Sequence, residues 1–317
     1  MPEPSTPPPF SDRPIRFGTR RSPLAMAQAH ETRARLCAAH GWDEAAIELV
    51  PVQASGDKIR DRPLADIGGK ALWTRELDQM LGDGTIDAAV HSLKDVETIR
   101  PSELTITAVL AREDRADRLL GARSLAALPP GAVVGTSAPR RAAQLLNARP
   151  DCTVVNFRGN VATRMAKLAA GDVDATFLAA AGLIRLGEDA VGVRLDPEDW
   201  FPAPAQAAIG IECRTDDAAM RALLAAIDHA PSHAEVRAER ALLAGLGGSC
   251  HSPIAALTDW DGEALVLRAA IYSSDGEVRI AGETRLTPGD DEPPRALARE
   301  LLERAPALVA GSFSGPA

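Results

Sequence analysis

The chain has 317 residues and a hydrophobic content of 45%, enough for two or three domains with buried cores. A net charge of −9 and only 3% aromatic residues argue against a nucleic-acid partner or general attraction to acidic membranes. No apolar run approaches the roughly 20 residues that a membrane span needs, so no membrane partner is expected.

Residues 1–14 contain six prolines and no apolar run, which predicts a disordered extension rather than a targeting peptide. A strand is expected over 15–19, followed by a helix with Ser22 as its N-cap and Gly41 as its stop signal. The pattern then predicts a strand over 47–52, a helix over 71–81 and a buried strand over 86–90. Such alternation is typical of an α/β layer with a mostly parallel sheet.

The same pattern recurs further along the chain. A strand over 132–136 again ends in Gly-Thr, and a helix follows with Pro139 near its start. A strand over 153–157, a helix over 161–170 and a strand near 175 complete the repeat. This repetition predicts two related α/β domains facing each other across a cleft, which is a common ligand site.

The C-terminal part has a different pattern. A helix is expected over 234–246, then a glycine-rich loop over 245–250 and strands with hairpin turns at 261–262 and 275–276. A last helix is expected over 294–309. We therefore predict a small third domain of the α+β class.

Arginines cluster where predicted strands give way to helices. Such ends face the ligand crevice of α/β sheets, and guanidinium groups match carboxylates and phosphates. Capped helices with solvated arginines are the alternative. No phosphate-binding glycine motif is present, which favours a ligand with several carboxylates. The clusters comprise Arg20 and Arg21, Arg140 and Arg141, and Arg158 with Arg164.

Two further residues are candidates for chemistry. Asp95 follows Lys94 at the end of a buried strand, so it is either half of a simple ion pair or a carboxylate that stabilises a cation and exchanges protons. Cys250 lies in the glycine-rich loop, whereas Cys37 and Cys213 have the pattern of inert buried thiols. A cysteine hydrolase with His91 or His251 as base remains an alternative, although no protease signature is present.

Ordered motifs along almost the whole chain resemble the porphobilinogen deaminase (hydroxymethylbilane synthase) family. They include residues 19–25, 68–70, 89–95, 112–114, 135–137, 140–141, 158–160, 181–183, 209–214 and 238–241. The resemblance implies two periplasmic-binding-protein-like (type II) α/β domains plus a small C-terminal α+β domain. The implied boundaries are 15–110 with 207–226 for domain 1, 111–206 for domain 2 and 227–317 for domain 3.

The resemblance also implies a function. A dipyrromethane cofactor would be held by a thioether to Cys250, and four porphobilinogen units would be condensed onto it with release of ammonia. Hydrolysis would then release hydroxymethylbilane, which makes the chain a transferase of tetrapyrrole biosynthesis. We expect a cytoplasmic monomer, with a non-catalytic polyanion binder or a slow paralogue as alternatives.

The implied site needs no metal. Asp95 matches the catalytic aspartate. The positions implied for the cofactor are Cys250, Lys94, Ser137, Arg140, Arg141, Thr136 and Ser22, and those for substrate are Arg20, Arg158, Arg164, Arg185, Gln206 and Lys70.

The chain departs from the family pattern at several places. Asp66 replaces a common lysine, and Ala71 and Trp73 replace glycine and phenylalanine. Ala138-Pro139 stands for Ser-Leu. Ala205-Gln206-Ala207 replaces Gly-Gln-Gly and Gly248-Ser249-Cys250 replaces Gly-Gly-Cys, two changes expected to stiffen a hinge and the cofactor loop.

Overall fold

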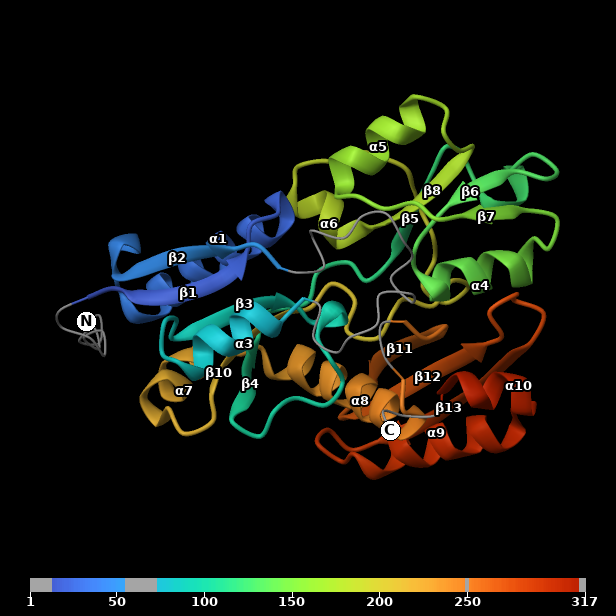
Figure 1. Cartoon of the computed structure of the whole chain (residues 1–317). Helices are drawn as coiled ribbons and strands as arrows, with labels where there is room; N and C mark the ends of the chain where they lie inside the picture. Colours follow the sequence, from blue (N-terminus) through green and yellow to red (C-terminus); the bar gives the residue numbers. More distant parts are fainter. Residues whose placement is uncertain (1–12, 55–72, 249–250, 314–317) are drawn as a thin grey trace. The chain divides into compact units, whose positions relative to one another are not determined.

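The computed structural model describes residues 13–54, 73–248 and 251–313 (Figure 1). These residues form two compact units. The first contains residues up to 112 together with 208–233, and the second contains 113–207 together with 234–313. The chain therefore leaves the first unit, builds part of the second, and returns before it completes the second.

The first unit is built on a five-stranded sheet of order β2-β1-β3-β10-β4. β1 (Ile15–Arg20) pairs in parallel with β2 (Ile47–Val52) and β3 (Ala88–Ser92). β10 (Ile209–Arg214) runs antiparallel between β3 and β4 (Leu104–Val109). The sheet is thus mostly parallel, as predicted, with one antiparallel strand supplied by the returning chain.

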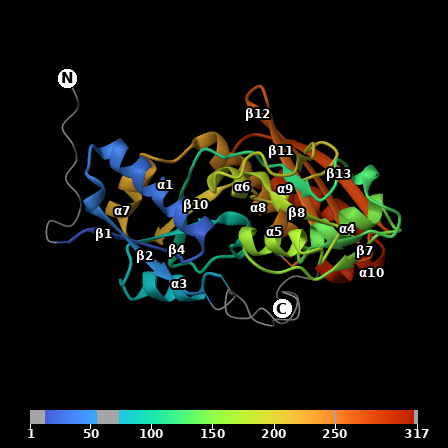
Figure 2. The same ribbon diagram turned by 90° about the horizontal axis from the view of Figure 1, so that it is seen from above.

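Helices cover both faces of this sheet (Figure 2). α1 (Pro23–His40) and α7 (Ala218–Ala225) pack on one face and α3 (Arg75–Gly82) on the other. Ser22 caps α1, accepting a hydrogen bond from the Ala25 backbone, and Gly41 ends it with φ 69°. Side chains alternate along a strand, so successive residues of β3 face the α1–α7 layer and the α3 layer alternately.

The second unit contains a sheet of the same design, in the order β7-β6-β8-β5-β9. β6 (Val133–Gly135) is parallel to β7 (Thr153–Val155) and β8 (Ala175–Ala179), while β5 (Asp117–Leu120) runs antiparallel between β8 and β9 (Val193–Arg194). The helices are α4 (Pro139–Ala148), α5 (Val161–Ala169) and α6 (Ala180–Arg185). The shared strand order confirms the predicted pair of related α/β sheets.

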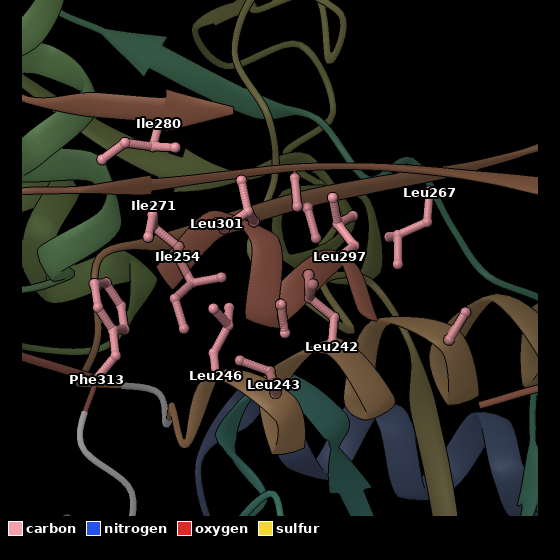
Figure 3. Close-up of a cluster of buried hydrophobic side chains, with 14 of the residues drawn as sticks. Leu242, Leu243, Leu246, Ile254, Leu267, Ile271, Ile280, Leu297, Leu301 and Phe313 are labelled. Carbon is pink, nitrogen blue, oxygen red and sulfur yellow. The ribbon is translucent and has the colours of Figure 1, made fainter. Parts of the chain in front are cut away.

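The C-terminal part forms an antiparallel three-stranded sheet with helices. Its elements are α8 (Ala230–Leu246), β11 (Ile254–Asp261), β12 (Ala264–Tyr272), β13 (Arg279–Leu286) and α9 (Glu292–Arg304). Leu242, Ile271, Leu297 and Phe313 meet in its hydrophobic core (Figure 3). The predicted α+β class and both hairpin turns are confirmed, with Gly262 and Gly276 at φ 63° and 76°.

Some predicted bounds are wrong. The single last helix expected over 294–309 is two helices, because α9 ends at Arg304 and α10 (Ala307–Ala310) begins after Pro306. Proline supplies no backbone N–H and disfavours a helical conformation in the residue before it. The strand expected over 86–90 lies two residues later, and the strands expected over 132–136 and 153–157 are shorter.

Candidate active site

A pocket opens in the first unit at the carboxyl end of β3. Its lining comes from β1, α1, β3, the start of α3 and a short 3-10 turn, η3 (Leu93–Asp95). The lining residues are Arg20, Ala25, Gln28, Trp73, Thr74, Val90, His91, Ser92, Asp95 and Val96. Two residues predicted from the sequence, Arg20 and Asp95, are therefore brought together.

Asp95 is positioned by the turn that carries it. The backbone N–H of Leu93 donates to Ala208 O over 3.1 Å, and the buried Leu93 side chain packs on Gly210 of β10. A Cβ atom at Gly210 would lie 2.3 Å from Leu93 Cδ2, so glycine is needed for this approach. The anchored leucine fixes the turn and leaves the Asp95 carboxylate at the pocket.

Asp95 keeps capacity to accept hydrogen bonds. Its side chain is 35% exposed, and its Oδ2 lies 3.7 Å from Arg20 Nη1. This distance is long for a hydrogen bond but short enough for mutual charge stabilisation. The Arg20 guanidinium also lies over the Trp73 ring, with Cζ 4.1 Å from the ring centroid, a cation–π contact that orients it.

Polar groups on the α1 side complete the wall. Ser92 Oγ donates to Gln28 Oε1 over 2.9 Å, which ties the end of β3 to α1. Ser22 lies at the start of α1 as its N-cap, and Lys94 is half-buried on the same turn as Asp95.

A buried charged cluster lies on the α3 face of the sheet behind the pocket. Glu212 on β10 accepts hydrogen bonds of 2.8 Å from Arg100 Nε and Nη2, and its Oε2 lies 3.3 Å from His91 Nε2. Burial opposes ionisation of Glu212, but the contacts with His91 and Arg100 prevail and lower its pKa to about 2. Arg100 also binds Asp78 and Glu97, so one guanidinium serves three carboxylates.

Three other predicted residues meet in the second unit around a buried carboxylate, Asp117. Arg140 Nη2 and Arg141 Nη2 each donate to Asp117 over 2.7 Å, and Gln206 Nε2 donates over 2.9 Å. Trp200 Nε1 donates as well, over 2.9 Å. Burial disfavours the Asp117 anion, yet the two guanidiniums outweigh that cost and hold its pKa far below the usual range.

The remaining predicted residues of the second unit lie near strand ends and on helices. Ser137, just after β6, donates to Asn156 Oδ1 over 2.6 Å, and Thr136 Oγ1 accepts from the Ala138 backbone. Arg185 at the end of α6 donates to Ala207 O over 3.0 Å. Arg158 follows β7 and Arg164 lies on α5, both half-buried.

Lys70 and Cys250 lie outside the described residues, as do Asp66 and Ser249. The other three cysteines are buried and free, and burial is the largest of the causes that raise the pKa of each thiol. The predicted burial of Cys37 and Cys213 is confirmed.

Sequence reasoning missed Asp117 and the cluster around Glu212. An aspartate beginning the apolar run of Leu119 and Leu120 was an available signal, since an isolated acid entering a buried strand needs cationic partners. Trp73 was noted only as a departure, yet it lines the pocket.

The two alanines that replace glycine carry a positive φ. Ala205 has φ 57° and Ala207 has φ 70°, and they are the non-glycine residues with left-handed backbone within the described ranges. The Ala205 N–H donates to buried Glu239 Oε2 over 2.6 Å. The backbone that glycine would adopt is thus retained, at a conformational cost of about 1–2 kcal/mol for each alanine.

Within residues 13–54, 73–248 and 251–313, no three acidic, histidine or cysteine side chains form a metal-type group. Among the helices of these same ranges, none is long and apolar enough to cross a membrane.

Comparisons with known proteins identify the relatives of the chain. Residues 15–222 match the model of "Porphobilinogen deaminase, dipyromethane cofactor binding domain", and residues 233–305 match "Porphobilinogen deaminase, C-terminal domain". A porphobilinogen deaminase of Sphingopyxis alaskensis is 56% identical over 309 residues, covering 96% of this chain and 98% of that protein. One from Paracoccus denitrificans is 50% identical over 304 residues, covering 94% and 97%.

Solved structures with a similar course of the chain are more distant. The VFT2 domain of Bordetella pertussis BvgS is 16% identical with a TM-score of 0.40, covering 71% of this chain and 91% of that one. A periplasmic His/Glu/Gln/Arg/opine family-binding protein from Silicibacter pomeroyi is 18% identical with a TM-score of 0.36, covering 67% and 88%.

Proposed function

The chain belongs to the porphobilinogen deaminase family, and on that premise we propose that it condenses four porphobilinogen units into hydroxymethylbilane with release of ammonia. The observation that carries the proposal is the pairing of Asp95 with Arg20 in one pocket. A pyrrole with acidic side chains presents both an N–H donor and carboxylates. Asp95 suits the first and Arg20 the second.

Asp95 has the chemistry that the reaction demands. Departure of ammonia from porphobilinogen leaves a positive charge spread over the pyrrole ring, and a fixed carboxylate nearby stabilises that charge. The partly exposed Asp95 carboxylate can also accept the pyrrole N–H, because Arg20 stands 3.7 Å away rather than in a close hydrogen bond. We assign the catalytic role to Asp95.

The pocket residues fit the dipyrromethane cofactor, since Asp95 accepts hydrogen bonds and Arg20 is cationic. When bound, this group supplies the nucleophilic pyrrole carbon and remains on the enzyme. We propose Cys250 as its covalent attachment point, and Lys94, Ser22, Thr136, Ser137, Arg140 and Arg141 as further contacts. Arg20, Lys70, Arg158, Arg164, Arg185 and Gln206 are proposed to hold carboxylates of substrate.

The proposed roles of Arg140 and Arg141 must coexist with their bonds to Asp117. Each guanidinium has five N–H donors, so a pair that shares one carboxylate retains others. Arg140 Nε, which is buried, has no hydrogen-bond partner among the described residues. We propose that this N–H donates to a ligand carboxylate.

Mass spectrometry of the intact chain tests the proposal. The wild-type protein should carry the added mass of two pyrrole units, and Cys250→Ser should lose it. Cys213→Ser is the matched control, because Cys213 is a buried thiol and should leave the adduct in place. An unmodified wild type made in cells that supply porphobilinogen would contradict the cofactor assignment.

Asp95→Ala tests the catalytic assignment. We expect the fold and the cofactor adduct to persist, with ammonia release reduced by at least about a hundredfold, the lower end of what positioned acid–base groups contribute. Near-normal ammonia release in this variant would remove Asp95 from the mechanism.

We further propose that the enzyme is a cytoplasmic monomer of the hydroxymethylbilane synthase class of transferases. Three described cysteines are free thiols, which agrees with a reducing compartment. Light scattering after size-exclusion chromatography should give the mass of one chain, 33.4 kDa before modification.

A further inference from the structure

His91 and Thr74 line the same pocket as Arg20. The His91 side chain is only 4% exposed. Gly210 faces His91 across the β3–β10 pair, and Glu212 lies two residues further along β10. The side chain of His91 is thus held between the pocket and the buried acid of the neighbouring strand.

The orientation of the imidazole follows from its charge contact. His91 Nε2 lies 3.3 Å from Glu212 Oε2, close enough for electrostatic pairing although not aligned as a full hydrogen bond. Because Glu212 is ionised, the ring nitrogen that faces it carries hydrogen. In the neutral ring Nδ1 then carries the lone pair, and no described residue hydrogen-bonds to it.

The cluster behind His91 is acidic. Thr74 Oγ1 contacts both Asp78 Oδ2, at 3.1 Å, and Glu97 Oε2, at 2.8 Å. With Glu212, three carboxylates then share one guanidinium, Arg100, so this cluster has an excess of negative charge. Figure 1 shows α3, which supplies Asp78, alongside β3. The charged residues that line the pocket itself are Arg20 and Asp95, apart from the imidazole of His91.

We propose that His91, backed by Glu212, forms the subsite for the aminomethyl ammonium group of porphobilinogen. The ammonium would donate a hydrogen bond to His91 Nδ1. The proposal rests on the proposed function. It orients the substrate in the pocket, with an acidic side chain toward Arg20 and the ammonium toward the acid-backed wall. A carboxylate behind an imidazole strengthens the imidazole as an acceptor, as it does in metal sites.

The chemistry balances without a further reactant. The carbon–nitrogen bond breaks, its electron pair leaves with nitrogen as neutral ammonia, and the positive charge passes to the pyrrole-stabilised methylene carbon near Asp95. His91 holds the leaving group before the bond breaks and takes up no proton from it. Glu212 does not touch the ligand and is a positioning residue.

The test compares porphobilinogen with its hydroxymethyl analogue, in which a neutral oxygen replaces the ammonium. His91→Gln can direct its amide N–H toward Glu212, but it has no acceptor at the position of the ring Nδ1. In the cofactor-loaded enzyme this variant should raise KM for porphobilinogen about tenfold more than KM for the analogue, the size expected for a hydrogen bond to a charged group. An equal effect on both substrates would overturn the subsite.

A matched control and a second measurement separate the possible failures. His229→Gln alters a histidine of the same unit that bonds Ser232 rather than lining the pocket, and it should change neither KM.

Nitrogen-15 spectra of the full chain should show the Nε2–H tautomer for His91, lost in Glu212→Gln. An Nδ1–H tautomer in the wild type would also overturn the subsite. Absence of ammonia release by wild-type enzyme would instead refute the proposed function.

Discussion

At the scale of single residues, two of the buried carboxylates, Asp117 and Glu212, are held ionised by charged neighbours rather than by solvent. Asp117 contacts the guanidiniums of Arg140 and Arg141, and Glu212 contacts Arg100 and His91. An ion pair of this kind stabilises the fold little relative to apolar packing, but removing one partner leaves an uncompensated buried charge. Both residues therefore matter mainly for where they hold Arg140, Arg141 and His91.

Asp117→Asn should destabilise the protein by about 3–5 kcal/mol, because two buried guanidiniums lose their counter-charge. Asp261→Asn breaks an exposed pair with Arg285 and should cost no more than about 1 kcal/mol. Urea unfolding of both variants measures the difference. Equal losses would show that Asp117 is not a buried electrostatic centre.

The strained backbone at Ala205 gives a second prediction at this scale. Ala205→Val adds a β-branched side chain at φ 57° in a fully buried position and should cost about 2–4 kcal/mol. Ala205→Gly relieves the strain but raises the conformational entropy of the unfolded chain. The two effects oppose each other, so the free energy of unfolding should change by no more than about 1 kcal/mol. Thermal unfolding of the pair separates the two, and a valine variant as stable as the glycine variant would contradict the left-handed conformation.

At the scale of elements, the C-terminal sheet packs closely against helix α4 of the second α/β layer, within one unit. The turn between β12 and β13 lies against α4, where Asn147 Nδ2 donates to Gly276 O over 2.8 Å. A Cβ atom at Gly276 would lie 2.6 Å from Ala143 O and from Asn147 N. The turn therefore requires glycine for contact as well as for φ.

Two glycine-to-alanine variants isolate that contact. Gly276 and Gly262 both have positive φ, but a Cβ at Gly262 meets nothing within 4 Å. Both variants should pay a left-handed backbone cost of about 1 kcal/mol, and Gly276→Ala should lose roughly 1–3 kcal/mol more. Denaturant unfolding reports both values. A Gly276→Ala variant no less stable than Gly262→Ala would mean that the turn does not pack on α4.

Much of this element-level organisation could be predicted from the sequence. The cap at Ser22, the stop at Gly41 and both glycine hairpin turns obey local rules, so those elements were found close to their bounds. Pro306 carried a signal for a helix break that the apolar periodicity around it obscured. The antiparallel place of β10 depends on contacts between distant segments and was not predicted; the family resemblance implied only that the chain returns to the first domain.

The site was predictable in part for the same reason. Asp95 and Arg20 lie at strand ends, which sequence patterns locate, and they do meet in one pocket. The cluster of Glu212, Arg100 and Asp78 joins residues more than a hundred positions apart. No local pattern encodes such a pairing, since it arises only when β10 enters the sheet.

At the scale of the whole molecule, stability should fall in acid. The folded-state pKa values of Asp117 and Glu212 lie below their ordinary values near 4, so their contribution is fully present above about pH 5. It is lost as pH falls through the folded values, because the unfolded chain binds protons first. Urea midpoints should therefore drop between about pH 4 and pH 2.

Asp117→Asn supplies the control for this pH dependence. The variant lacks the Asp117 titration, so its stability should fall less steeply over the same acidic interval than that of the wild type. Parallel slopes for the two proteins would show that other carboxylates dominate acid unfolding.

The return of the chain to its first sheet sets an order of events during synthesis. β10 separates β3 from β4, yet it is translated only after residues 113–207 have been synthesised. Until Arg214 emerges, β3 and β4 have no bridging strand, and their open edges can pair with other chains. The nascent protein thus holds an incomplete first sheet while the second is already being made, which makes this interval the natural point for chaperone protection.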